Sequence, residues 1–280
     1  TARFSVEIGE WYSVVIYPVV SGFLSYSVSW IPFSLEEIVV VGAVLLLIFI
    51  IVNGIRKRRV FVMILFQAFE FLLWIYVWFY IGWGCNYYRE SIYTRLGVER
   101  QSYNEEVFKD FITDYADSLN STYETLPNDL FYVGYDYFEN QVKEAFAALP
   151  SSAGLSAPRQ WQHPKRLLFN ELYSSVGVMG FMGPFFCETQ LNNDLLPWQF
   201  HFVYVHEYSH LLGVSSEDEA NFWAYTICTH SDDPVLRYAG YYSLLPYVLI
   251  NASRVLSEED YRQFVSTINP AVIAMYNAQR

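Results

Sequence analysis

Two long apolar segments separated by a cluster of cations constrain the fold of this chain more than any other feature. Residues 35–55 and 60–83 contain few charged side chains, and Arg56 to Arg59 between them are all cationic. Each segment reaches the roughly 20 residues that a helix needs to cross a bilayer. Because loops rich in lysine and arginine stay on the cytoplasmic side, the pattern predicts a transmembrane hairpin with a cytoplasmic loop.

Residues 11–33 form a weaker apolar stretch, interrupted by Pro18 and several serines. This stretch is compatible with a third span, a re-entrant segment or a helix lying along the membrane interface. We therefore expect residues 1–89 to form a membrane region that contacts the lipid bilayer. Both outer ends of the hairpin, and the chain that follows, are then expected outside the cytoplasm.

The composition agrees with this division and excludes one class of partner. Hydrophobic residues make up 53% of the chain and charged residues only 16%, an excess that the two apolar segments explain. The net charge of −12 lies mostly after them, which argues against nucleic acid as a partner. Three cysteines without CxxC spacing indicate neither a disulfide framework nor a thiolate zinc site.

Residues 90–280 read as a largely helical domain with a small amount of strand. Apolar residues recur at helical spacing in 108–119 and again in 129–149, which predicts two amphipathic helices. Residues 176–191 are the best strand candidate, although glycines interrupt them. The expected fold class is mainly α (α+β), with a small sheet that exposes an edge strand.

The sequence His206-Glu207-Tyr208-Ser209-His210 is an HExxH motif. On a helix, residues four apart lie on the same face, so both imidazoles can reach one metal ion. Glu207 lies about 100° round the helix from His206, within reach of a water bound to that metal. Two nitrogens, a third protein ligand and an open place for water are how a catalytic zinc ion is held.

A polar helix face would show the same spacing by chance, but the surroundings of the motif favour a metal site. Apolar residues flank it on both sides, so the helix is expected to be buried and its histidines to need partners. Gly213 then supplies a helix stop. Directly afterwards come Glu217, Asp218 and Glu219, any of which could be the third ligand. Helix capping explains the same acids equally well, and spacing alone does not rank them.

HEYSH followed by SEDEANFWAY resembles the gluzincin metallopeptidases. In that clan a second helix carries a Glu-Ala-Asp or Glu-Ala-Asn triplet whose glutamate completes the metal site. The resemblance implies that Glu219 is the third ligand of one zinc ion. It also implies that Ala220 lets the two helices approach and that Asn221 steadies a ligand histidine.

A second resemblance covers most of the chain and is carried by the segments Pro32 to Ser34, Trp83 to Arg89, Gly183 to Phe185 and Glu188 to Asn192, together with the HExxH–EAN pair. These segments are similar to an uncharacterised family of bacterial membrane proteins that are predicted zinc peptidases by motif only. The resemblance implies a multi-pass protein of the bacterial cytoplasmic membrane. Residues 90–280 would form a zincin-like domain on its extracytoplasmic side.

The resulting expectation is a zinc-dependent peptidase that acts on peptide or protein substrates with Glu207 as general base. Tyr241, Tyr242 and His230 are candidates for stabilising the oxyanion. Residues 184–190 are expected to be an edge strand that pairs with substrate, with Glu188 facing either substrate or solvent. The alternative is a zinc-binding membrane sensor or binding protein, in which the metal site is latent or is structural and closed by a fourth protein ligand such as His230.

Overall fold

The computed structural model describes residues 5–127 and 135–278, which are mainly helical with a small three-stranded sheet. The chain folds into two compact units whose sequences are interleaved. Unit 1 comprises residues 1–96, 150–194 and 207–220, and unit 2 comprises residues 97–149, 195–206 and 221–280. This division differs from the expected one at residue 89, because segments from the second half of the chain pack with the N-terminal region.

Unit 1 begins with a helical run that buries one of its faces. The run consists of α1 (Val6–Trp11), the π-helical turn η1 (Tyr12–Ile16) and α2 (Tyr17–Ser27). Tyr17 and Leu24 are buried, whereas Val19 and Phe23 are exposed. Within the described residues, only the two helices that follow are long and apolar enough to cross a membrane, so residues 11–33 are not among the candidate spans.

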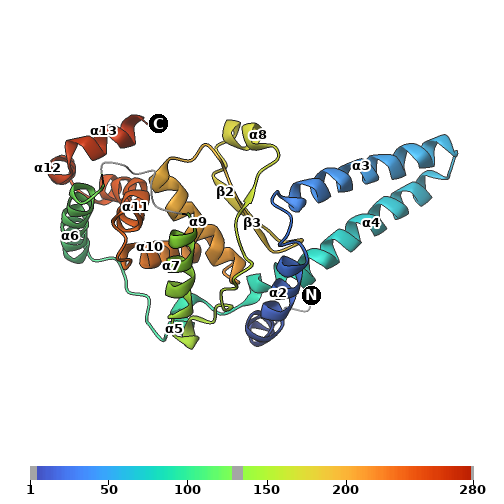
Figure 1. Cartoon of the computed structure of the whole chain (residues 1–280), viewed down its shortest axis with the longest axis horizontal. Helices are drawn as coiled ribbons and strands as arrows, with labels where there is room; N and C mark the ends of the chain where they lie inside the picture. The colour runs from blue at the N-terminus through green and yellow to red at the C-terminus, as the bar shows by residue number, and fades with distance from the viewer. Residues whose placement is uncertain (1–4, 128–134, 279–280) are drawn as a thin grey trace. The chain divides into compact units, whose positions relative to one another are not determined.

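Those two helices are α3 (Leu35–Arg56) and α4 (Phe61–Gly82), which form a hairpin extending away from the sheet of unit 1 (Figure 1). The hydroxyl of Ser34 caps α3 by accepting a hydrogen bond from the Glu37 amide at 3.2 Å. Most residues of both helices are exposed, as is expected of helices surrounded by lipid, and few are buried. The hairpin therefore has the predicted bounds to within two residues.

The sheet has the strand order β1-β3-β2, formed by β1 (Lys165–Arg166), β2 (Gly180–Gly183) and β3 (Glu188–Leu191). β3 pairs in parallel with β1 and antiparallel with β2. The expectation that residues 184–190 form the edge strand was wrong. Residues 184–187 form the turn, and Glu188 starts the central strand.

The side chain of Glu188 is buried and has a structural partner on each side. Its Oε1 forms an ion pair with Lys165, and its Oε2 accepts the amide of Leu35 at 3.1 Å and that of Glu36 at 3.3 Å. A carboxylate at these free amides stabilises the N-terminus of α3. Glu188 therefore joins the sheet to the first turn of the hairpin and faces neither solvent nor a strand edge.

The remaining elements of unit 1 are short: η2 (Gly84–Tyr88), α5 (Ile92–Leu96), η3 (Ser151–Ala153) and α8 (Asn170–Ser175). α9 (Pro197–Leu211) and α10 (Glu217–Thr229) contribute residues to both units. The three cysteines, Cys85, Cys187 and Cys228, are free, so the chain contains no disulfide among them.

Unit 2 is a helical assembly built from α6 (Glu105–Glu124), α7 (Tyr135–Ala147), α11 (Pro234–Val255), α12 (Glu258–Thr267) and α13 (Pro270–Ala278). Its core includes Leu119 of α6 and Leu245 of α11, both fully buried. Burying such a side chain contributes about 1.5–3 kcal/mol to stability. The predicted amphipathic helix at 108–119 is confirmed. The one at 129–149 is confirmed from Tyr135 onward, and its first residues lie outside the described part of the chain.

Candidate metal centre

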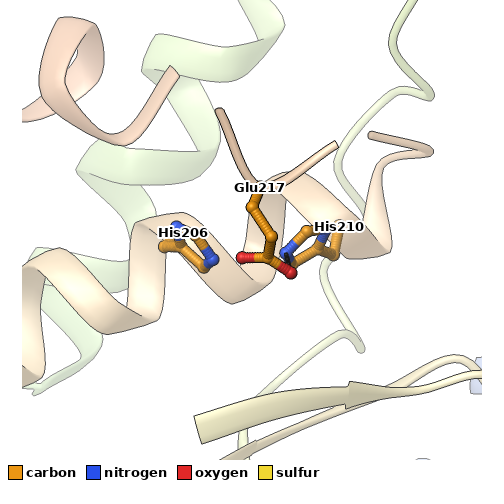
Figure 2. A group of neighbouring side chains, drawn as sticks. All are labelled: His206, His210 and Glu217. Carbon is orange, nitrogen blue, oxygen red and sulfur yellow. Dashed lines mark ion pairs between the residues drawn. The ribbon is translucent and has the colours of Figure 1, made fainter. Parts of the chain in front are cut away.

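The HExxH motif lies on α9, as predicted, and its two histidines face the same side of that helix (Figure 2). His206, His210 and Glu217 offer one ligand atom each, and these atoms all lie within 4.8 Å of one another. Figure 2 shows the carboxylate of Glu217 between the two imidazole rings. Glu217 belongs to the first turn of α10, so a helix, a tight connection and a second helix assemble the group.

Hydrogen bonds determine which nitrogen each histidine presents to the group. Nδ1 of His206 lies 3.0 Å from Oδ1 of Asn221, and Nδ1 of His210 lies 2.7 Å from the carbonyl oxygen of Val214. Both oxygens can only accept, so each Nδ1 carries the proton. In the neutral ring each Nε2 then has a lone pair, which is the form that binds a metal. The expected contact between Asn221 and a histidine of the motif is present.

Glu217 reaches the group because of its position on α10. Its Oε1 lies 3.6 Å from Nε2 of His210, and its side chain is 76% exposed. Residues four apart share a helix face, so Glu217 and Asn221 project from the same side of α10. One turn of α10 thus supplies both the acidic group and the residue that orients His206.

Glu219, the acid that the resemblance selects, forms an ion pair in this structure. It follows Glu217 by two residues, which turns it about 200° round the helix. Its Oε1 forms an ion pair with Arg95, and these side chains are only 9% and 4% exposed respectively. Nη1 of Arg95 also donates to the carbonyl oxygen of Ala153 at 2.6 Å. The structure therefore groups Glu217, and not Glu219, with the two histidines.

Glu207 is buried beside the group, and this burial changes its acidity. Desolvation raises the pKa of Glu207 to about 7, with a further increase from the charge of Glu217 and an opposing effect of His210. At His210 burial acts to lower the pKa, but the nearby carboxylate of Glu217, the charge of Glu207 and the Val214 carbonyl together raise it. A carboxyl group with a pKa in this range can accept and release a proton near neutral pH.

The C-terminal end of the motif helix is held by four donors from unit 1. The last carbonyls of a helix have no partner within the helix. Here those of residues 210–213 accept, in order, from Trp83 Nε1 at 3.3 Å, Tyr17 Oη at 2.8 Å, the Ser156 amide at 2.8 Å and Arg89 Nη1 at 3.0 Å. These contacts fix the helix turn that bears His210, and Gly213 provides the left-handed backbone (φ 104°) that ends it.

Sequence reasoning gave no role at this helix end to Trp83 or Arg89. Both belong to the segment Trp83 to Arg89 that directly follows the hairpin. Their polar groups donate to carbonyls more than a hundred residues further along the chain. Such long-range hydrogen bonds cannot be predicted from local spacing. The only sequence signal is the position of a tryptophan and an arginine, both side-chain donors, at the end of an apolar segment.

The three oxyanion candidates have different surroundings. His230 is exposed, with Nδ1 2.9 Å from the carbonyl oxygen of Thr226, and it does not belong to the His–Glu group. Tyr242 is 4% exposed in the core of unit 2. Tyr241 packs partly buried against that core. A role for any of these side chains in stabilising an oxyanion stays a prediction.

The fold and this group define a mainly helical protein with two apolar helices of membrane-spanning length and a candidate His–His–Glu metal centre. Residues 12–280 match the family model described as protein of unknown function (DUF3810), so the chain belongs to that family. No curated protein and no solved structure matches the chain.

Proposed function

We propose that this protein is a membrane-anchored, zinc-dependent peptidase that hydrolyses peptide or protein substrates outside the cytoplasm. The observation that carries the proposal is the donor set. Two imidazoles whose Nδ1 atoms face hydrogen-bond acceptors and the carboxylate of Glu217 have ligand atoms within 4.8 Å of one another, and the buried carboxylate of Glu207 lies beside them.

The chemistry of the donors favours zinc. Nitrogen and carboxylate ligands suit Zn²⁺, whereas calcium and magnesium take oxygen ligands. Structural zinc sites are closed by four protein ligands, whereas catalytic sites have three and leave one place for water. Among the described residues, the group has three members, and His230 is not one of them. A three-ligand set supports a catalytic site over a structural one.

In this proposal His206, His210 and Glu217 hold the metal, in place of the Glu219 that the resemblance implies. The metal would lower the pKa of a bound water toward ~7 and polarise the scissile carbonyl. The carboxylate of Glu207 would accept a proton from the attacking water and would later give it to the leaving amine nitrogen. Asn221 and the Val214 carbonyl keep both histidines in the tautomer that leaves Nε2 free.

The hairpin supports anchoring in the bacterial cytoplasmic membrane. α3 and α4 each have 22 residues, and at about 1.5 Å per residue each helix spans roughly the ~30 Å hydrocarbon core. The cations at Arg56 to Arg59 connect the far ends of the two helices. The preference of such loops for the cytoplasm would place the rest of unit 1, including His210, on the other side.

The role of Glu207 is tested by digesting a peptide library with the purified full chain and with the Glu207→Gln variant. The amide cannot accept the proton, so the variant is expected to keep its zinc and to lose about 10²–10⁴-fold in cleavage rate. A matched control is Glu259→Gln, which changes an acid on α12. Cleavage that survives in Glu207→Gln contradicts the assigned base. Zinc binding with no Glu207-dependent cleavage would favour a binding or sensor protein.

A further inference from the structure

Residues 168–179, here called the apolar tip, expose large apolar side chains from a short segment that includes α8. The segment contains a single charged residue, Glu171. The exposed apolar side chains are Leu168, Phe169, Leu172, Val176 and Met179. Such a concentration of exposed apolar surface marks a contact with a partner or a membrane.

The apolar tip is tied to the first turn of the first candidate span. The buried carboxylate of Glu37 on α3 accepts the amide of Leu168 at 2.7 Å and that of Phe169 at 3.0 Å. Directly before the tip, the carbonyl oxygen of Arg166 accepts the amide of Ser34 at 3.0 Å. The first two residues of the tip are therefore hydrogen-bonded directly to a side chain in the first turn of α3.

The other end of the tip leads to the exit of the second candidate span. Met179 directly precedes β2, and the β2–β3 turn follows at residues 184–187. The indole nitrogen of Trp78, one turn before the end of α4, donates to the carbonyl oxygen of Phe185 in that turn at 3.1 Å. The sheet and the tip are thus attached at the end of the hairpin opposite to the cations at Arg56 to Arg59.

We propose that the apolar tip is a membrane-contact surface that inserts into the boundary between headgroups and acyl chains, beside the hairpin. The occupant is lipid because the tip adjoins the residues at which α3 would enter the bilayer. Exposed apolar side chains at that depth gain free energy by leaving water. The proposal rests on the membrane anchoring proposed above and is independent of the metal and of catalysis.

A two-point attachment has a consequence for the candidate metal centre. Trp83, the residue after α4, donates to the carbonyl oxygen of His210, and their rings lie 6.5 Å apart. With both the hairpin and the tip in the bilayer, unit 1 cannot pivot freely about the hairpin. His210 would then be held close to the membrane surface. Substrate segments of other membrane-attached proteins lie at that height and could reach the candidate metal centre.

The test uses the full chain in lipid vesicles, with a polarity-sensitive fluorophore on single introduced cysteines. Cys85 is replaced by serine, and the buried Cys187 and Cys228 are left in place. Leu172→Cys and Val176→Cys report on the tip, and Leu46→Cys in the middle of α3 is the positive control. Ile250→Cys on α11, at 47% exposure, is the matched exposed apolar control.

We expect lipids with a quencher near the headgroup to quench the labels at 172 and 176, and aqueous iodide to spare them. At 250 the pattern should be reversed. Iodide quenching at 172 and 176 equal to that at 250 would overturn the proposal. Labels shielded from both quenchers would also overturn it, since a protein surface then covers the tip.

If lipid quenchers do not reach a label at residue 46, the proposed membrane anchoring is contradicted. The proposal for the tip, which rests on it, is then contradicted as well. Zinc content measured on the same preparations reports separately on the metal centre. Failure of the tip and failure of the proposed site can therefore be told apart.

Discussion

At the scale of single residues, Glu217 and Glu219 show why the candidate site was only partly predictable. The HExxH spacing fixes His206, Glu207 and His210 on one helix, because that relation is local. The choice among the acids that follow depends on where α10 begins and which way it is turned. Glu217 lies four residues before Asn221 and shares its helix face, whereas the adjacent Glu-Ala-Asn triplet points to Glu219.

The ion pair between Arg95 and Glu219 is expected to stabilise unit 1. Replacing Arg95 by alanine removes this buried ion pair, which costs about 3–5 kcal/mol. The free energy of unfolding of the full chain in detergent, measured with denaturant, checks this value. Arg262→Ala is the control, because Arg262 and Glu258 form an exposed pair whose loss should change stability little. Equal stability of the two variants would show that Glu219 is not held in this way.

At the scale of elements, the sequence predicts the helices well and the sheet poorly. The bounds of α3 and α4 follow from sharp changes in polarity, and α6 follows from its apolar periodicity. The strand order could not be predicted, because β1 has only two residues and carries no pattern of its own. Its parallel pairing with β3 places Glu188 in the central strand, where the carboxylate caps α3.

The hairpin predicts a defined topology that labelling of intact cells can check. Lys57→Cys lies in the loop between α3 and α4, and Ile250→Cys lies on α11. Both variants also have Cys85 replaced by serine. In cells that express them, a membrane-impermeant maleimide should modify residue 250 before lysis and residue 57 only after lysis. Both positions are exposed, so accessibility depends on the membrane alone. Modification of residue 57 in intact cells would contradict the proposed orientation.

At the scale of the whole molecule, the two compact units do not coincide with the predicted membrane region and the domain that follows it. Unit 1 takes segments from three parts of the sequence, and its boundaries at 194 and 220 coincide with no change in composition. The N-terminal region reaches the motif helix through Tyr17, Trp83 and Arg89. The apolar hairpin of α3 and α4 therefore belongs to the same unit as His210 and Glu217.

The central claim is a zinc site formed by His206, His210 and Glu217. It is tested most directly by elemental analysis of the purified full chain, with Glu217→Gln and Glu219→Gln prepared in parallel. We predict equimolar zinc in the wild type and in Glu219→Gln, and loss of zinc in Glu217→Gln because an amide is a poor ligand in place of a carboxylate. A wild-type chain that binds no zinc would contradict the account. Zinc retained by Glu217→Gln and lost from Glu219→Gln would contradict the proposed ligand set.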